Sequence, residues 1–399
     1  MKQKTVLNGL LIIIAAVGCS SDKRAKDELP YVDVRKDYLE KEISLTDFAD
    51  VSYVHLKSDN DNYLYRATLF NFTITQNSIV VYDISSGSIL FFSRDGVPKS
   101  RFKRLGQGPE EYIKATRILY DEESDDVFVC DEDADHIQVY SSAGQYKRKI
   151  RFPQKISVNS LASFDSQSLF GDSQRFPNWP ERLREKSKEE IHYYTTYYRI
   201  NKTTGVVLDS FNLPSADNLA LVFELGKGAY GMTNYHRLVT DTEGFLLCNP
   251  ETDTVYLYKK NKSLTPIFRK MPSVRDQDPM VIIENLVKTG KYHFFSTWTV
   301  IDKRDPKYSS KYYVHDRETG EILIQKITLP DYKEKVFRIG AFSIAKQNYC
   351  DGNGYIYELD LIELKEAYRE GRLGGKLKEL VATLDEMKDN NVLMLVHFK

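Results

Sequence analysis

The chain has 399 residues, enough for one large domain or two ordinary ones. Its 56 basic and 57 acidic residues give a formal net charge of -1, which excludes the strongly basic character typical of nucleic-acid binders. Aromatic residues make up 12% of the chain, with 27 Tyr and 20 Phe, a composition that favours β-strands.

Residues 1–18 have the pattern of an export signal. Lys2 and Lys4 precede an apolar run over residues 6–17, and this run is too short for a transmembrane helix of about 20 residues. Gly18 and Cys19 follow directly, and a small residue before a cysteine at this point resembles the lipobox of bacterial lipoproteins. The resemblance implies a signal peptide over residues 1–18, then cleavage and acylation of Cys19, for example with palmitate.

Acyl chains on Cys19 would anchor the protein to a lipid bilayer. The alternative is an ordinary secretory signal with a cysteine at this place by chance. Residues 19–30 are polar and charged, which predicts a flexible tether between the anchor and the folded domain.

A hairpin-like block occurs three times, at residues 79–96, 127–144 and 245–262. Each block has an apolar run, an Asp or Asn, a mostly polar turn and a second apolar alternation. This pattern predicts a β-hairpin, and its recurrence is typical of propeller blades. Two further segments, YYRINKTTGVVL at 197–208 and YYVHDRETGEIL at 312–323, align with Gly205 opposite Gly320 and predict two more hairpins.

A sixth unit is indicated by Asp351-Gly-Asn-Gly354 before Tyr355. After it, residues 361–368 and the apolar positions 377, 380, 381 and 384 predict two short helices. Val392–Phe398 reads as a closing strand that pairs with the last blade, beside strands from the N-terminal segment between Tyr31 and Leu56. The sequence therefore predicts an all-β fold: a six-bladed β-propeller over residues 31–399, with short C-terminal helices before the closing strand.

Residues 71–151 resemble NHL repeats, especially DHIQVYSSAGQYKRKI at 135–150. More broadly, residues 30–399 resemble the six-bladed NHL-like or TolB-like propeller lipoproteins of the Bacteroidota envelope. The matching segments are LTDFADVSYVHL at 45–56, RLGQGPEEY at 104–112 and DNNVLMLVHFK at 389–399. The family usually has Gly where Glu110 stands. The resemblance implies a propeller in the cell envelope, as an outer membrane lipoprotein facing either the periplasm or the exterior, and it brings no activity.

The segment Arg104–Tyr112 has two interpretations. Gly106, Gly108 and Pro109 suit a tight turn between blades. Alternatively, the segment is a ligand loop at the propeller mouth, with Arg104, Gln107 and Glu111 as polar contacts. Trp179, on the polar insertion at residues 172–191, is a further ligand-binding candidate because an aromatic ring on a polar loop can stack on a sugar. Trp298, on a strand pattern, is expected in the core.

Several short motifs lack a residue or a structural context that their chemistry requires. Asp131, Asp133 and Asp135 have calcium-loop spacing, but His136 stands where a calcium loop needs Gly. Gly226–Gly231 satisfies a nucleotide-binding glycine pattern outside the required strand and helix, so we expect a connection between blades. No zinc, redox or serine-hydrolase motif is present, and we predict no metal and no cofactor.

The remaining cysteines and one threonine complete the candidates. Cys130 and Cys248 hold equivalent hairpin positions on separate blades, so they should not form a disulfide, and Cys350 completes the set. Asp253-Thr254-Val255 fits a short glycosylation pattern or a hairpin turn.

The favoured function is a binding module for a glycan, peptide or envelope protein, with no nucleic acid. A propeller lyase or hydrolase and a structural subunit of an envelope assembly stay open.

Overall fold

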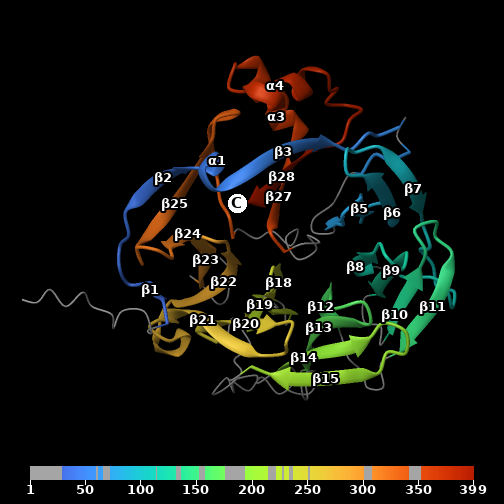
Figure 1. Ribbon diagram of the computed structural model, residues 1–399, viewed down its shortest axis with the longest axis horizontal. Helices are drawn as coiled ribbons and strands as arrows, with labels where there is room; N and C mark the ends of the chain where they lie inside the picture. Colours follow the sequence, from blue (N-terminus) through green and yellow to red (C-terminus); the bar gives the residue numbers. More distant parts are fainter. Residues whose placement is uncertain are drawn as a thin grey trace, which may run out of the picture.

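The chain forms a ring of six β-sheets around a central axis, a six-bladed β-propeller (Figure 1). This is a computed structural model, and it describes residues 29–59, 62–65, 72–113, 115–131, 136–151, 158–175, 194–213, 222–226, 229–232, 237–249, 252–300, 308–340 and 352–399. The predicted all-β fold is confirmed, and the ring accounts for the described sheets apart from one separate two-stranded hairpin.

Blades 1 to 3 are antiparallel sheets of four strands in chain order. Blade 1 contains β4 (Phe72–Ile74), β5 (Ser78–Asp83), β6 (Ser88–Ser93) and β7 (Pro98–Phe102). Blade 2 contains β8 (Ala115–Asp121), β9 (Asp126–Asp131), β10 (His136–Tyr140) and β11 (Tyr146–Arg151). Blade 3 contains β12 (Val158–Ser163), β13 (Ser168–Arg175), β14 (Tyr194–Asn201) and β15 (Val207–Asn212).

Blades 4 and 5 each contain four such strands and one strand from the N-terminal segment, and blade 5 contains β26 in addition. Blade 4 contains β18 (Arg237–Asp241), β19 (Gly244–Cys248), β20 (Thr254–Lys259) and β21 (Leu264–Met271), together with β1 (Tyr31–Asp33). Blade 5 contains β22 (Met280–Lys288), β23 (Tyr292–Val300), β24 (Tyr308–Asp316) and β25 (Ile322–Leu329), together with β2 (Glu40–Ser44) and β26 (Tyr332–Phe337). Blade 6 contains β27 (Gly354–Leu359), β28 (Val392–Phe398) and β3 (Ala49–His55).

The sequence repeats correspond to equivalent hairpins of the blades. The three blocks are the hairpins β5–β6, β9–β10 and β19–β20, and the second pair of segments is β14–β15 and β24–β25. Gly205 and Gly320 both have φ near +75°, at 73° and 76°, as their turns require. Cys130 and Cys248 form no disulfide with each other and are buried in separate core clusters, and Trp298 is buried as expected.

The ring is closed by the C-terminal strand. β28 lies between β27 and β3 and pairs antiparallel with both, with Leu395 opposite Ile356 on one side and Ser52 on the other. Its apolar side chains alternate: Val392, Met394 and Val396 enter the core shared with blade 5, while Leu393 and Leu395 enter the core shared with blade 1. The predicted closing strand, covered on both faces, is confirmed.

Two N-terminal strands lie elsewhere than expected. The sequence placed strands of the segment Tyr31–Leu56 beside the closing strand, and only β3 is there. β1 pairs parallel with β21, and β2 pairs parallel with β25. They cover outer strands of blades 4 and 5, which would otherwise present open edges. We call β1 and β2 the N-terminal belt.

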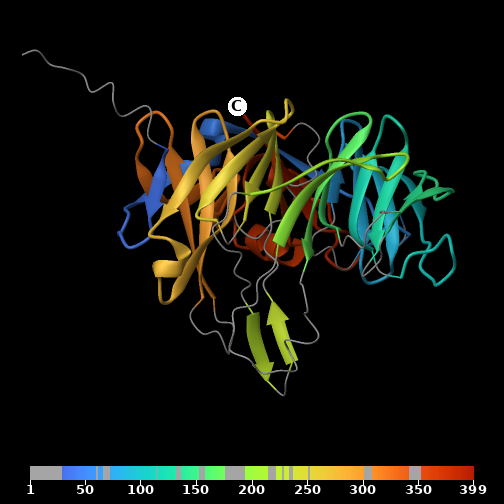
Figure 2. The ribbon, with the colours of Figure 1, turned by 90° about the horizontal axis from the view of Figure 1, so that it is seen from below.

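The two faces of the ring carry different elements (Figure 2). We call the face at which β28 ends the upper face, and Figure 2 shows the hairpin of β16 (Val222–Gly226) and β17 (Ala229–Met232) projecting from the opposite, lower face. Gly226 ends β16 and Gly231 lies in β17, so the described part of the glycine pattern belongs to a connection between blades 3 and 4, as expected.

The predicted helices are present as α3 (Leu361–Arg369) and α4 (Gly375–Ala382), after a short α1 (Leu45–Phe48). Asp360 begins α3 by accepting hydrogen bonds from the backbone N–H groups of Ile362 and Glu363. Leu384 lies beyond the end of α4 but is still buried. No helix in the described part of the chain is long and apolar enough to cross a membrane.

Candidate functional site

A hollow opens where the innermost strands of blades 1 to 4 end. It has a volume of roughly 550 Å³ and lies at the ends of β4, β8, β12 and β18, which contact one another around the axis. Two contacts connect this hollow to the end of β28. Gly352 lies against Asp241, at the end of β18, and the carbonyl of the next residue, Asn353, accepts a hydrogen bond from the backbone N–H of Phe398, the last residue of β28. The hollow is therefore on the upper face, and we call it the channel mouth. Its lining residues are Thr73, Ile74, Thr75, Gln76, Asn77, Leu119, Tyr120, Asp121, Glu122, Glu123, Ala162, Ser163 and Thr240.

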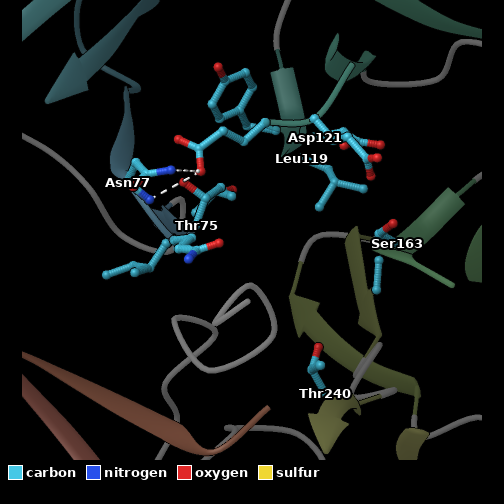
Figure 3. A pocket seen from close by; sticks show the side chains of 13 residues that line it. Thr75, Asn77, Leu119, Asp121, Ser163 and Thr240 are labelled. Atoms are coloured by element: carbon cyan, nitrogen blue, oxygen red, sulfur yellow. Dashed lines mark hydrogen bonds between the residues drawn. The ribbon is translucent and has the colours of Figure 1, made fainter. Parts of the chain in front are cut away.

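The polar rim follows from the turns that end these strands. In blade 1, the turn is closed by the Thr75 N–H donating to the Ser78 carbonyl at 2.9 Å and by the Ser78 N–H donating to Thr75 Oγ1 at 3.0 Å. Gln76 and Asn77 form the tip and are exposed. Figure 3 shows Asn77, Asp121, Ser163 and Thr240 around the same opening.

Glu122 connects blade 2 to blade 1. Its Oε2 accepts hydrogen bonds from the backbone N–H and Nδ2 of Asn77, at 3.1 and 3.2 Å (Figure 3). Its Oε1 accepts one from Ser78 Oγ at 2.7 Å. Partial burial alone would raise the pKa of Glu122, but the hydrogen bonds from Ser78, Asn77 and Thr75 outweigh it and lower the pKa below its ordinary value. The side chain is therefore a fixed carboxylate.

Asp121 connects blade 2 to blade 3. Lys202, from the turn between β14 and β15, places Nζ 2.6 Å from Asp121 Oδ2 and 2.9 Å from Ser163 Oγ. The lysine side chain is 6% exposed and the aspartate side chain 14%, so this ion pair is largely shielded from water. Such a pair fixes the geometry of the rim between the two blades.

The floor of the mouth is apolar. Ile74, Leu119 and Ala162, from the ends of three neighbouring first strands, are all buried. Thr73 Oγ1 donates to the Ile118 carbonyl at 3.2 Å, which joins the first strands of blades 1 and 2 beneath the rim. The mouth thus combines an apolar floor with a rim of hydroxyl, amide and carboxylate groups.

Arg104, Gln107 and Glu111 lie in the connection before β8, at the opposite end of that strand from the mouth. Arg104 Nε donates to the Gly144 carbonyl at 3.0 Å, and Gln107 is exposed. The three residues share one loop, and this loop lies away from the channel mouth. Trp179 and Cys19 lie outside the described residues.

The hydrogen bonds of this loop match the turn interpretation. Glu111 Oε2 accepts from the Gly108 N–H at 2.8 Å, and a Cβ added to Gly106 would lie only 1.9 Å from the same oxygen. Tyr112 is fully buried and donates its hydroxyl to the Gly87 carbonyl at 2.8 Å. Glu110 is not among the described residues with positive φ, so the turn does not need glycine there. The ligand-loop interpretation stays a prediction.

A family model described as "Domain of unknown function (DUF4934)" matches residues 29–397. The chain belongs to this family. Among solved structures, a "Putative exported protein" from Bacteroides fragilis NCTC 9343 gives a TM-score of 0.59 at 15% sequence identity, covering 90% of this chain and 98% of that chain. A DUF4221 family member from Bacteroides vulgatus ATCC 8482 gives a TM-score of 0.45 at 10% identity, covering 88% and 97%. No curated protein matches.

A second hollow of roughly 580 Å³ lies at the seam of blades 4 and 5, beside the first described residues, Leu29 and Pro30. It contains His293 and His315, whose Nδ1 atoms are 3.2 Å apart. Among the described residues, no group of three His, Cys, Asp or Glu side chains is placed to hold a metal ion. Of the calcium-like series, only Asp131 is described.

Sequence reasoning missed the residues of the channel mouth. Thr75, Asn77 and Glu122 stand in short polar turns and Ser163 ends β12, and such turns occur between most strands of any β-protein. The available signal was positional: each residue ends or follows the first strand of its blade, where a ring brings these strand ends together. Using it required assigning the first strands correctly, which the repeats alone did not do.

Proposed function

We propose that the protein is an envelope-anchored lipoprotein whose propeller binds a polar ligand at the channel mouth: a glycan, a peptide or a segment of a partner protein. The observation that carries this proposal is the mouth itself, to which four blades contribute side chains around roughly 550 Å³. Ligand pockets are typically about 300–1,000 Å³, with an apolar lining and a few fixed polar groups.

The chemistry of the mouth suits reversible recognition. The exposed side chains of Gln76, Asn77 and Ser163 offer hydrogen-bond donors and acceptors, and the buried floor offers apolar contact. Their turns are held by hydrogen bonds between blades, so little ordering cost is added when a ligand binds.

Binding has more support than catalysis. A general acid of the glycosidase type needs a raised pKa, so that the carboxyl group carries a proton near neutral pH. The pKa of Glu122 is lowered instead, because hydrogen bonds outweigh the effect of burial. Asp121 is ion-paired with Lys202. Both side chains serve as fixed carboxylates, which favours recognition over the lyase or hydrolase alternative.

Titration calorimetry of the purified protein with a panel of oligosaccharides and short peptides tests the site. Gln76→Trp places a large ring at the rim and should weaken binding at least about tenfold. Gln107→Ala, at the opposite end of β8, should leave binding unchanged. If Gln107→Ala abolishes binding and Gln76→Trp does not, the ligand site is the loop at residues 104–112 and the proposal for the mouth is wrong.

The anchoring part of the proposal is supported by the position of Cys19 after an apolar run and by the exported description of the Bacteroides fragilis protein. Cys19→Ser should release a folded protein from the membrane fraction and abolish incorporation of labelled palmitate. Continued labelling of the Cys19→Ser protein would contradict the lipobox interpretation.

A further inference from the structure

We propose that the hollow at the seam of blades 4 and 5 is a second ligand site, which binds a small organic carboxylate through Arg317 and the pair of His293 and His315. The site is separate from the channel mouth, so this inference does not depend on the proposed function. Its volume of roughly 580 Å³ is typical of ligand pockets, and Leu257 and Ile267 offer apolar contact to the rest of the ligand.

The strands place the two imidazole rings side by side at the wall of the hollow. His293 and His315 are register partners on the neighbouring strands β23 and β24. Phe268 of blade 4 packs against both rings, with centroids 5.8 and 5.6 Å away. The two histidines are 4% and 6% exposed, and both line the hollow. Contacts from two blades therefore fix the rings in place.

The hydrogen bond between the rings leaves one polar atom of each ring without a partner. The two Nδ1 atoms are 3.2 Å apart, so one of them donates a proton and the other accepts it. Burial lowers the pKa of both histidines, so both rings are neutral near pH 7.

It follows that one Nε2 atom carries a proton and the other has a free lone pair. No described residue forms a hydrogen bond with either Nε2. Buried polar atoms nearly always have a partner. A ligand with an acceptor oxygen and a neighbouring hydroxyl or amide N–H would satisfy both nitrogens of this pair.

Arg317 supplies the positive charge. Its Nη1 donates to the carbonyls of Thr289 and Gly290, at 2.7 and 2.8 Å, which holds the guanidinium group at the edge of the hollow. Its Nε and Nη2 donate to no described residue, and no described carboxylate forms an ion pair with it. The remaining N–H groups have the fork geometry that binds a carboxylate through two parallel hydrogen bonds.

The two lysines of the hollow are already neutralised. Lys288 pairs with Asp241 at 3.2 Å and also with Glu243, and Glu243 pairs with Lys259 at 3.0 Å. Two cations and two carboxylates thus form one closed network. Arg317 stands outside this network, so an anionic ligand can bind to it without breaking an ion pair.

The acidic residues next to Arg317 have partners of their own. Asp316 Oδ1 accepts from the backbone N–H groups of Glu318 and Thr319, at 2.9 and 3.1 Å. Glu318 Oε2 lies 4.0 Å from Lys291 Nζ. Neither Asp316 nor Glu318 lines the hollow, where three basic side chains and one acidic side chain are present. The hollow therefore favours an anion over a cation.

The test compares two matched pairs of probes by titration calorimetry near pH 7. The first pair is the galacturonic acid disaccharide and its methyl ester. The second is an N-acetylated dipeptide with a free C-terminal carboxylate and the same dipeptide as its amide. Each ester or amide lacks only the negative charge, so we expect the acid of at least one pair to bind about tenfold or more tightly than its neutral partner.

Arg317→Gln removes the fork and the charge, and it should abolish this preference. Lys291→Gln is the matched control, because it removes the same charge from a neighbouring residue that does not line the hollow. Thr265→Trp, at an exposed lining position, should block the hollow and weaken binding of the acid at least about tenfold. The nitrogen NMR signals of the two imidazoles should shift when the acid binds.

Several results would overturn the inference. Equal affinity for the acid and its neutral partner would mean that the carboxylate is not recognised, and tighter binding of inorganic phosphate than of either acid would mean that the site selects another anion. If Gln76→Trp weakens binding of the acid and Thr265→Trp does not, the acid binds at the channel mouth instead. If neither acid binds at about 10 mM, the hollow is not a carboxylate site.

Discussion

Asn390 shows how one buried side chain holds the two ends of the chain together. Its Nδ2 donates to the carbonyls of Leu56 and Tyr63, at 2.7 and 3.0 Å, and its Oδ1 accepts from the Tyr65 N–H at 3.0 Å. The residue is 1% exposed. It joins the start of the closing strand to the segment that leaves β3, and water cannot replace these bonds easily.

We expect Asn390→Ala to lower the free energy of unfolding by about 2–3 kcal/mol, because it leaves buried backbone groups without partners. Asn261→Ala is the control. Asn261 is exposed, its side chain accepts hydrogen bonds from Ser263 of its own turn, and its loss should cost less than about 1 kcal/mol. Urea unfolding of the two variants measures the difference, and equal costs would contradict the role given to Asn390.

The pair of His293 and His315 makes stability depend on pH. His293 is 4% exposed and His315 6%. Burial lowers the pKa of His293 well below its ordinary value, and His315, Arg317 and Lys288 add to the effect. Burial also lowers the pKa of His315. The folded protein therefore binds fewer protons than the unfolded chain when the pH falls below the unfolded pKa of about 6.5.

The free energy of unfolding therefore falls as the pH is lowered from about 6.5, because the unfolded chain takes up protons that the buried His293 and His315 do not bind. His293→Gln should reduce the loss of unfolding free energy between about pH 7 and pH 5 by up to about 2 kcal/mol relative to the unmodified protein. His397→Gln, at an exposed position on β28, is the matched control. Urea unfolding at a series of pH values measures both, and parallel curves for all three proteins would refute the explanation.

At the scale of elements, turn glycines show how neighbouring blades meet. Gly144, in the turn between β10 and β11, has φ of 77°, and a Cβ there would lie 2.4 Å from the Cβ of Phe102 in blade 1. Gly320 lies in the corresponding turn of blade 5, between β24 and β25, with φ of 76°, but nothing lies within 4 Å of the added atom. The two positions share a backbone conformation and differ in their surroundings.

Gly320→Ala should therefore cost only the left-handed backbone penalty, about 1–2 kcal/mol. Gly144→Ala should cost clearly more, because blade 1 must also move away from blade 2. Thermal unfolding of the two variants separates the backbone penalty from the cost of the contact between the blades. Equal losses would mean that the contact between blades is more compliant than the distance indicates.

The hairpins could be predicted from the sequence because their information is local. Apolar alternation and turn chemistry near Asp83 or Gly205 lie within about 20 residues of the strands that they join, so the repeats reveal them. β1 and β2 could not be placed, because parallel pairing with β21 and β25 is set by contacts more than 200 residues away in the sequence. Short strands such as Tyr31–Asp33 carry too few residues to indicate a partner.

The channel mouth was out of reach for the same physical reason. Asn77, Glu122, Ser163 and Thr240 come from four blades and meet only when the ring is closed. By contrast, the segment at residues 104–112 attracted attention because its glycines are conspicuous, and its contacts are those of a turn that supports the blades. The glycines of residues 104–112 therefore reflect a tight turn of the backbone, whereas the candidate site lies at ordinary turns without such a motif.

At the scale of the whole molecule, the N- and C-terminal segments both pair with strands that would otherwise be sheet edges. The belt covers the outer edges of blades 4 and 5, and β3 completes the sheet begun by β27 and β28. Blade 6 therefore contains strands from both ends of the chain, so the ring cannot close before the last residues are present. Its stability should depend on the closing strand as a unit rather than on any single side chain.

Deleting residues 391–399 tests this dependence. The deletion removes β28 from between β27 and β3, leaves both strands with unpaired edges and opens the two cores that Met394 and Leu395 enter. We expect a large fall in the melting temperature of the whole domain, together with aggregation through the open edges. Removing Lys399 alone leaves all the pairs of β28 in place and should have a small effect. If the nine-residue truncation melts within a degree or two of the intact chain and stays monomeric, closure by β28 is not what holds the ring together, and blades 1 to 5 must be stable as an open sheet array.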